Sequence, residues 1–474
     1  MISMVRLKEP LRVVSKGPLL PVELDRRRPL GLQVEVRVRE LIRSGGLQPG
    51  AVLPSTRALA ADLEVSRGVA VAAYAQLAAE GYIAVRRGAA PTVLALAGVS
   101  EPPAVEIDVP VALARINLRP DLPDLALFPR ADWSAAERAS LQRAANTDLA
   151  YGEPFGAAEL RHGLAPFLVR TRGVVASADR TGVHAGSTQA LLVVAEALRA
   201  EGIRRIGVED PGHRWRTRTL EASGLDVVPI PVDADGLRID ALDGVDAVVV
   251  SPDHHFPSGV ALAPDRRRAL VEWAVRGGFA IVEHDYDGHF RYDRPAAGTL
   301  QALAPEHVAY VGSASAMLAP TLRIGWSVLP ARLVVPVANR MFATVVAQPR
   351  LPQLALAELI RRGSLDRQLR KVRAAYRRRR ALLVAESATL FPGARLTGGP
   401  AGLYVALALA DGADEVGILA AARSRGLALD GVGEHRLRPQ PPGLVLGFAA
   451  APEPTLRRGL EELAAAMTAT PSHV

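Results

Sequence analysis

At 474 residues the chain is too long for one ordinary domain, and its 49% apolar and 22% charged residues are typical of a globular protein rather than a disordered one. It has no cysteine, which excludes disulfides, thiolate catalysis and cysteine-ligated metal sites. It also lacks the run of ~20 apolar residues that a membrane-spanning helix needs, and the apolar core of a signal peptide, so we expect a cytoplasmic protein without a membrane partner.

The net charge of +8 is compatible with a polyanionic partner, although an arginine-rich composition alone is weak evidence for one. The choice of basic residue is more informative. Lysine occurs only at Lys8, Lys16 and Lys371, and every other residue counted as basic is arginine. A reaction that needs a lysine amine as its nucleophile therefore has almost no candidate in the middle of the chain.

Residues 1–24 read as a basic leader without periodicity, and residues 25–95 begin with a pattern that predicts three helices. The first helix follows Pro29, and a pair of glycines ends it. Ser55 and Ser66 are good N-caps for the second and third helices, because a serine side chain accepts a hydrogen bond from the first helical turn.

Two short strands are expected next, at 82–85 and 91–94, on either side of a turn at 86–88. Three helices followed by a two-stranded wing form the layout of a winged helix-turn-helix. Three segments closely resemble the DNA-binding domain of the GntR family. They are Leu-Pro-Ser-Thr-Arg-Ala-Leu-Ala at 53–60, Val-Ser-Arg at 65–67 and Ala-Glu-Gly-Tyr-Ile at 79–83.

A recognition helix enters the major groove by its N-terminal residues, so Ser66, Arg67 and Gly68 are predicted to face bases or phosphates. An arginine there can bond guanine O6 and N7 together. Arg57 begins the preceding helix, where it can contact phosphate and set the register. The resemblance implies that the partner is double-stranded DNA. It also implies that five residues contact the DNA, the last two of them at the tip of the wing: Arg57, Ser66, Arg67, Arg87 and Gly88.

The third helix departs from the family, in which Thr or Asn often follows the Ser-Arg pair and a further basic residue comes shortly after. Here Gly68 and Val71 stand in that stretch, which leaves fewer side chains to read bases. The alternative that Arg57 and Arg67 are only surface arginines is less favoured, because both lie within the motif.

A Pro- and Val-bearing stretch at 96–118 is expected to be a linker. Beyond it, helical segments alternate with short apolar runs, which predicts an α/β fold with a largely parallel sheet. The strand candidates are 206–209, 247–251, 280–283 and 308–312. An arginine-rich segment at 367–380 has helical periodicity, and a solvated helix is favoured there over a second nucleic-acid site.

Motifs across residues 119–465 resemble fold-type I aminotransferases in the form found in the MocR group of GntR regulators. They are Leu-Pro-Asp-Leu-Ala-Leu-Phe-Pro at 122–129, Tyr-Gly-Glu-Pro at 151–154, Gly-Ser-Thr-Gln-Ala-Leu at 186–191, Glu-Asp-Pro-Gly at 209–212, Phe-Pro-Ser-Gly-Val at 256–260, Asp-Tyr-Asp at 285–287 and Leu-Ala-Pro-Thr-Leu-Arg-Ile-Gly at 318–325. The resemblance implies a multidomain chain: an α+β winged helix-turn-helix, then an α/β aminotransferase-like domain with a large subdomain at 119–335 and a smaller C-terminal α+β subdomain at 336–474.

That family binds pyridoxal phosphate, so the resemblance implies a site for this cofactor. Gly186, Ser187 and Thr188 precede a helical run whose first amides could hold a phosphate. Arg323 matches the phosphate-binding arginine of the family, and Tyr286 matches the tyrosine that bonds the hydroxyl of the cofactor ring.

The reactive part of the site differs from the family. Ser-Lys-Thr-Leu reads Ser315-Ala316-Met317-Leu318 here, so Ala316 stands where the Schiff-base lysine is expected. His284 aligns with the carboxylate under the pyridine nitrogen, with Asp285 as the alternative one residue away, and His213 stands where a tyrosine usually stacks on the ring. These changes predict a site that neither attaches the cofactor covalently nor catalyses transamination. Its predicted residues are Gly186, Ser187, Thr188, His213, His284, Tyr286, Ser315 and Arg323.

Other interpretations remain. The site could bind pyridoxal phosphate non-covalently, or another small phosphate or carboxylate. A metal site is a weak alternative, since no spaced ligand motif joins the polar residues that suggest it, which are His254, His255, His284, Asp285 and His289.

The sequence as a whole predicts a transcriptional regulator that binds an operator as a homodimer, with the aminotransferase-like domain supplying the dimer interface and a candidate effector pocket. The alternatives are an aminotransferase with a helix-turn-helix extension, and a protein-binding scaffold with a vestigial winged helix.

Overall fold

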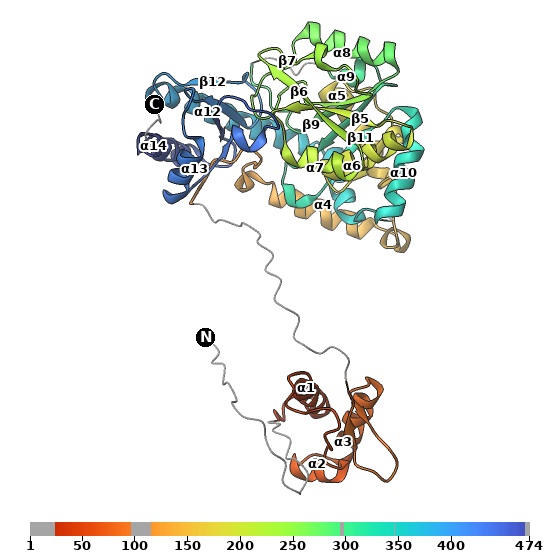
Figure 1. Ribbon diagram of the computed structural model, residues 1–474. Coiled ribbons are helices and arrows are strands. Elements are labelled where there is room, and N and C mark those ends of the chain that lie inside the picture. The colour runs from red at the N-terminus through yellow and green to blue at the C-terminus, as the bar shows by residue number, and fades with distance from the viewer. Residues whose placement is uncertain (1–23, 96–114, 294–297, 346, 470–474) are drawn as a thin grey trace. The chain divides into compact units, whose positions relative to one another are not determined.

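The computed structural model describes residues 24–95, 115–293, 298–345 and 347–469. The chain forms two compact units, 1–110 and 111–474, drawn in Figure 1. All but the last residue of the predicted basic leader, and most of the predicted linker, lie outside the described residues.

The first unit consists of three helices and a two-stranded wing. Its elements are α1 (Leu30–Arg43), α2 (Thr56–Asp62), α3 (Arg67–Ala79), β1 (Ile83–Ala84) and β2 (Thr92–Val93). Both predicted serine caps are present: Ser55 Oγ accepts from the Ala58 amide at 3.1 Å, and Ser66 Oγ accepts from the Val69 amide at 3.4 Å. The antiparallel strands β1 and β2 are shorter than the sequence predicts.

Buried apolar side chains from every element of the first unit meet in one core. They include Val34, Val38, Leu59, Tyr74, Leu77, Ile83 and Val93. The core fixes α3 by one side only, which leaves its opposite side to solvent.

The large part of the second unit is built on an eight-stranded sheet. Its order is β4 (Thr181–His184), β11 (Gly325–Val328), β10 (Val308–Ser313), β9 (Ala280–Asp285), β8 (Ala247–Val250), β5 (Arg205–Asp210), β6 (Asp226–Asp233) and β7 (Gly236–Leu237). The five strands from β10 to β6 run parallel, while β11 is antiparallel to both its neighbours and β7 is antiparallel to β6. All four strand candidates are therefore strands of this largely parallel sheet.

Helices cover both faces of the sheet, which explains why the central strand β8 is apolar at every position. Along β8, Val249 packs into a cluster with α6 and α10, while its neighbour Val248 packs into a different cluster with α8. The helices of this part are α4 (Arg130–Arg143), α5 (Ala158–Arg172), α6 (Ser187–Ala200), α7 (Arg214–Ala222), α8 (Pro264–Gly277), α9 (Leu300–Leu303), α10 (Ala331–Val345) and α11 (Arg350–Arg361).

The smaller C-terminal part carries a four-stranded antiparallel sheet and three helices, shown in blue in Figure 1. Its elements are β12 (Arg395–Thr397), β13 (Tyr404–Ala408), β16 (Gly443–Gly447), β15 (Asp430–Gly431), α12 (Ser364–Leu390), α13 (Glu415–Ser424) and α14 (Glu453–Ala469). The arginine-rich segment lies within α12, and one of its arginines, Arg379, is buried against Asp124 at 2.6 Å.

Two predicted boundaries are wrong. The smaller part was expected to begin at residue 336, but α10 and α11 pack on the large part, because Leu333, Val337 and Met341 bury their side chains against α6. The linker was expected to reach residue 118, but β3 (Ile116–Asn117) pairs with β14 (Leu427–Ala428). Residues 116–118 thus belong to the smaller part, through hydrogen bonds to a segment far away in the sequence.

Candidate functional site

The predicted DNA-contacting residues of the first unit lie at its surface. Ser66 caps α3, and Arg67 and Gly68, which follow it, are exposed. Arg57 is exposed on the first turn of α2. Arg87 and Gly88 are exposed in the turn between the strands of the wing, where Gly88 has a φ of +82° that favours glycine.

Some described arginines of this unit have a carboxylate partner and others do not; besides the three predicted to contact DNA, the others are Arg27, Arg43 and Arg86. Arg26, Arg28, Arg37 and Arg39 each form an ion pair with a carboxylate of the unit. Within residues 24–95, no carboxylate pairs with Arg57, Arg67 or Arg87. A guanidinium without an internal partner keeps its positive charge and its donors available for an external anion such as phosphate.

In the second unit, the predicted phosphate cradle lies where β4 leads into α6. Gly186 has a φ of +88°, and a Cβ added there would lie 3.2 Å from the guanidinium carbon of Arg323. Arg323 is exposed, and its Nη2 donates to the Ala185 carbonyl at 2.9 Å. Ser187 and Thr188 form the first turn of α6. A positive helix end and an arginine therefore converge, as an anion site requires.

The segment predicted to align with the lysine of the family follows β10. Ser315 is half-buried, and its amide donates to Ser313 Oγ at 3.4 Å. Ala316 is half-buried and packs against the main apolar cluster. Its methyl group offers no nucleophile, and Lys371, the one lysine among the described residues, lies exposed on α12.

His284, at the end of β9, is held by a buried arginine that the sequence analysis did not single out. Arg216 on α7 donates to His284 Nδ1 at 3.1 Å, to Glu209 at 3.0 Å and to Ser251 at 2.9 Å. Because a guanidinium only donates, Nδ1 must accept, and the neutral ring carries its proton on Nε2. Burial and then the charge of Arg216 hold the pKa of His284 well below its usual range.

This arrangement differs chemically from a carboxylate. A carboxylate stabilises a protonated pyridine nitrogen, whereas a neutral His284 can offer that nitrogen only an N–H donor. His284 Nε2 is buried and has no hydrogen-bond partner among the described residues. The position therefore does not supply the negative charge that makes the cofactor an electron sink.

Asp285, the alternative residue for this position, is already hydrogen-bonded to other groups of the protein. It accepts from Arg172 Nε at 2.5 Å, from Tyr310 at 2.6 Å and from the Gly288 amide at 2.8 Å. Burial alone would raise the pKa of Asp285, but the opposing effects of Arg172, His289 and Tyr310 together lower it. Asp285 is thus a structural carboxylate bonded to α5 and β10, which favours the alignment through His284.

Aromatic rings fill the space around His213 and Tyr286. The ring of His213 stacks on Phe256 with centroids 3.8 Å apart and meets Tyr286 edge-on at 5.4 Å. Tyr286 donates to the His254 carbonyl at 2.7 Å, and its oxygen lies 2.6 Å from that of Tyr404. The tyrosine expected to hold a ring hydroxyl is therefore already bonded to β13 of the smaller part.

These contacts allow a test of fit for pyridoxal phosphate. The start of α6 and Arg323 fit its phosphate, and His213 offers an aromatic face. Ala316 and His284 do not fit its covalent attachment or its activation. Of the eight predicted site residues, the structure brings His213, His284 and Tyr286 together in one cluster, and Gly186, Ser187 and Arg323 in another.

The sequence analysis missed Arg172, Arg216 and Tyr404. The first two belong to arginine-bearing helices that look like ordinary solvent-exposed helices, and no local pattern marks which arginine is buried. The metal alternative has no support in the described ranges, where no group of three or more His, Asp or Glu side chains could hold an ion. No described helix is both long and apolar enough to cross a membrane.

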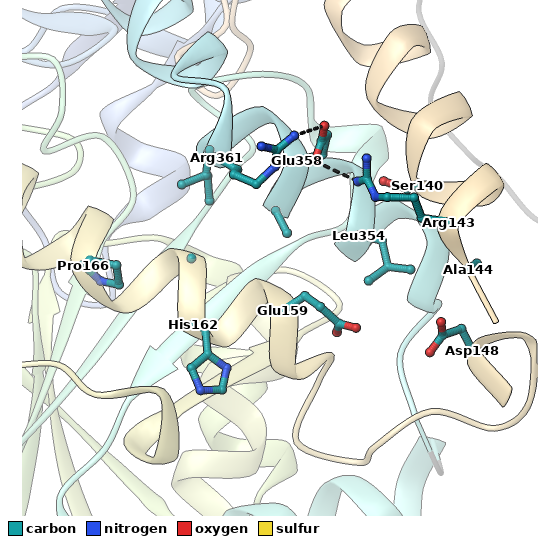
Figure 2. Close-up of a pocket in the computed structure, with 13 residues that line it drawn as sticks. Ser140, Arg143, Ala144, Asp148, Glu159, His162, Pro166, Leu354, Glu358 and Arg361 are labelled. Carbon is teal, nitrogen blue, oxygen red and sulfur yellow. Dashed lines mark hydrogen bonds and ion pairs between the residues drawn. The ribbon is translucent and has the colours of Figure 1, made fainter.

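A groove of about 750 Å³ lies apart from this cluster, between α4, α5 and α11 (Figure 2). On one side Arg143 of α4 and Arg361 of α11 converge on Glu358, at 2.8 and 2.7 Å. Hydrogen bonds from Arg361, Arg362 and Arg143 lower the pKa of Glu358 to about 2. Apolar groups such as Leu354 line the rest of the groove.

Comparison with protein families agrees with the two units. A model described as bacterial regulatory proteins of the gntR family matches residues 30–93, and a model described as aminotransferase class I and II matches residues 123–425. The HTH-type pyridoxine biosynthesis transcriptional regulator PdxR of Corynebacterium glutamicum is 32% identical over 471 residues, which cover 95% of this chain and 99% of that protein.

Further relatives are also regulators by description. A probable rhizopine catabolism regulatory protein, MocR, of Rhizobium meliloti is 27% identical over 96% of this chain and 97% of its own length. Among solved structures, kynurenine aminotransferase of Pyrococcus horikoshii matches with a TM-score of 0.69 and 24% identity, over 76% of this chain and 92% of that one. At that identity the structural match establishes the aminotransferase fold of the second unit and nothing about its chemistry.

Proposed function

This chain belongs to the MocR-type subgroup of the GntR family, and we propose that it is a DNA-binding transcriptional regulator whose aminotransferase-like domain pairs two copies and senses a small molecule. The observation that carries the proposal is the set of arginines without internal carboxylate partners at the starts of α2 and α3 and on the wing. In a winged helix-turn-helix these are the positions that meet DNA.

The proposal assigns no catalysis to the aminotransferase-like domain. Ala316 offers no amine, and His284, which stands in place of a carboxylate, is kept neutral by burial and by the charge of Arg216. Both changes remove what transamination needs, while the anion cradle at Gly186 and Arg323 is kept. A site with a cradle and no reactive group suits reversible, non-covalent binding of pyridoxal phosphate or a related small anion.

Pairing through the aminotransferase-like domain is supported by apolar groups that stay exposed on α4, α11 and the segment between α4 and α5. Tyr151, between α4 and α5, is 92% exposed. Three leucines are also exposed: Leu141 on α4, Leu149 between α4 and α5, and Leu351 on α11. Together with the groove in Figure 2 they form a surface that a second copy could cover. A two-fold dimer would present two recognition helices to a palindromic operator.

An effector would act by preferring one arrangement of the large and small parts. Tyr286 of the large part and Tyr404 of the smaller part lie against each other, with their oxygens 2.6 Å apart. Because the Tyr286 proton goes to the His254 carbonyl, the single proton of Tyr404 bonds either the Tyr286 oxygen or the His255 carbonyl, which is 3.0 Å away. A ligand hydroxyl that bonds Tyr286 competes with Tyr404. Such competition would link ligand binding to the relative position of the two parts, as coupling between sites requires.

The test is a footprint of the purified full chain on DNA next to its own gene, with and without pyridoxal phosphate. A protected, near-palindromic segment whose affinity changes with the ligand is expected. Conversion of an amino acid to its keto acid by the same preparation would contradict the assignment, and so would equal affinity for all DNA sequences.

A lysine introduced at position 316 tests whether this residue faces the predicted pyridoxal phosphate site. Ala316→Lys is expected to gain a covalent pyridoxyl group at residue 316 after incubation with pyridoxal phosphate and borohydride, read by peptide mass spectrometry. The wild type is expected to lack any adduct on the peptide that contains Ala316, because a methyl group cannot condense with an aldehyde. Adducts at the exposed Lys371 serve as the internal control for surface labelling. An adduct at Lys371 alone in Ala316→Lys would show that residue 316 does not face the cofactor.

A further inference from the structure

The solvent side of the recognition helix α3 has an unusual chemistry. Its buried residues are Ala70, Ala73, Tyr74 and Leu77, and the residues exposed on the opposite side are Gly68, Val71, Ala72, Ala75, Gln76 and Ala79, with Arg67 at the start of the helix. In its first two turns, which are the part that enters a major groove, Arg67 is the one exposed side chain that can donate hydrogen bonds.

Val71 is the largest apolar group on that side. It is 46% exposed, whereas Val69 is half-buried and its Cγ1 lies 3.9 Å from a Cβ added at Gly31 of α1. The fold of the unit therefore uses Val69 for packing and leaves Val71 to solvent. Val71 is thus available for a contact outside the unit, and unlike the exposed Val36 of α1 it lies on the helix predicted to enter the major groove.

Arg67 and Val71 are neighbours on the helix surface, because residues four apart lie one above the other. They are separated by about 6 Å along the helix axis, at a rise of about 1.5 Å per residue. Base pairs stack about 3.4 Å apart, so the base edges that the two side chains reach differ by at most about two base pairs.

Only one feature of a base edge in the major groove is apolar, and it is the C5-methyl group of thymine. Valine and alanine side chains have no donor or acceptor with which to read the other edges. We propose that Val71 reads the methyl group of a thymine, within about two base pairs of a guanine that Arg67 reads, so that operator recognition depends on one hydrogen-bonded base and on methyl contacts beside it. This inference rests on the proposed DNA-binding function and names what its recognition helix selects.

The experiment separates the methyl group from every other property of thymine. The full chain is used to select binding sequences from a random duplex pool, and the selected duplex is then made with deoxyuridine in place of thymidine at one position at a time. Uracil pairs like thymine and lacks only the C5-methyl group. The guanine read by Arg67 is located as the position whose preference is lost in Arg67→Ala.

We expect one thymine near that guanine at which deoxyuridine weakens binding by the wild type about fourfold, the effect of one buried methyl group. Val71→Ala should lose this discrimination. Val36→Ala is the matched control, since Val36 is also a solvent-exposed valine on a helix of the same unit (39% exposed on α1), and it should keep the discrimination.

The outcomes are distinguishable. A pool that yields no enriched sequence contradicts the DNA-binding function itself. Enriched sequences that tolerate deoxyuridine everywhere leave that function intact and overturn the methyl proposal. Discrimination that survives in Val71→Ala also overturns it, because another residue would then read the methyl group.

Discussion

Arg67→Ala is expected to lower the affinity of the full chain for its selected DNA about ten- to a hundredfold. The reason is that a bidentate arginine–guanine contact contributes about 1–3 kcal/mol of discrimination, and Arg67 is the one exposed donor in the first two turns of α3. Fluorescence anisotropy with the selected duplex and with a scrambled duplex measures the effect. The ratio of the two affinities should fall, because a lost base contact affects only the specific complex.

Arg37→Ala is the matched control for that loss. It removes the same charge from the same unit, but Arg37 lies on α1 and pairs with Glu40 at 3.2 Å. A single exposed ion pair contributes little to stability, so this variant should fold normally and keep the ratio of affinities. If the two variants weaken binding equally on both duplexes, Arg67 acts only through its charge, and the assignment of α3 as the base-reading helix fails.

The winged unit was almost fully predictable because its signals are local. Ser55 and Ser66 mark helix starts through bonds to amides three residues away, and both bonds are present. The strands of the second unit were predictable for a similar reason. A parallel strand covered on both faces is apolar at every position, as Val248 and Val249 illustrate by packing on opposite sides of the sheet.

Features that depend on packing between distant segments could not be predicted from the sequence. The division at residue 336 failed because the apolar face of α10 does not indicate which part it will cover. Arg216 could not be distinguished from its exposed neighbours Arg214 and Arg218 on α7, although it is the residue that fixes the protonation of His284. At the predicted cofactor site, the family resemblance singled out His284 and Ala316, but it could not identify the buried partner of His284, which is Arg216.

Arg172→Met is expected to destabilise the second unit by about 3–5 kcal/mol, the cost of leaving buried charge without its partner. Arg172 is 2% exposed on α5, and it bonds Asp285, Asp253 and the Gly288 carbonyl. Methionine keeps the length and most of the apolar volume, so the loss reports charge rather than a cavity. Urea unfolding followed by tryptophan fluorescence measures it, since all four tryptophans lie in the second unit: Trp133, Trp215, Trp273 and Trp326.

The control for Arg172 lies two residues away on the same helix. Arg170 is 59% exposed and pairs with Asp366 at 3.0 Å, so Arg170→Met should cost less than about 1 kcal/mol.

The effect of pH on the stability of Arg172→Met gives a second check. In the wild type the pKa of Asp285 is lowered, so its contribution to stability is present above the usual aspartate pKa and is lost as the pH falls. Without Arg172, burial raises the pKa of Asp285, and a proton neutralises the unpaired charge; the deficit of Arg172→Met should therefore shrink as the pH is lowered from 7.5 towards 5. A deficit that stays constant over that range would mean that lost packing, and not the unpaired carboxylate beside His284, is what destabilises the variant.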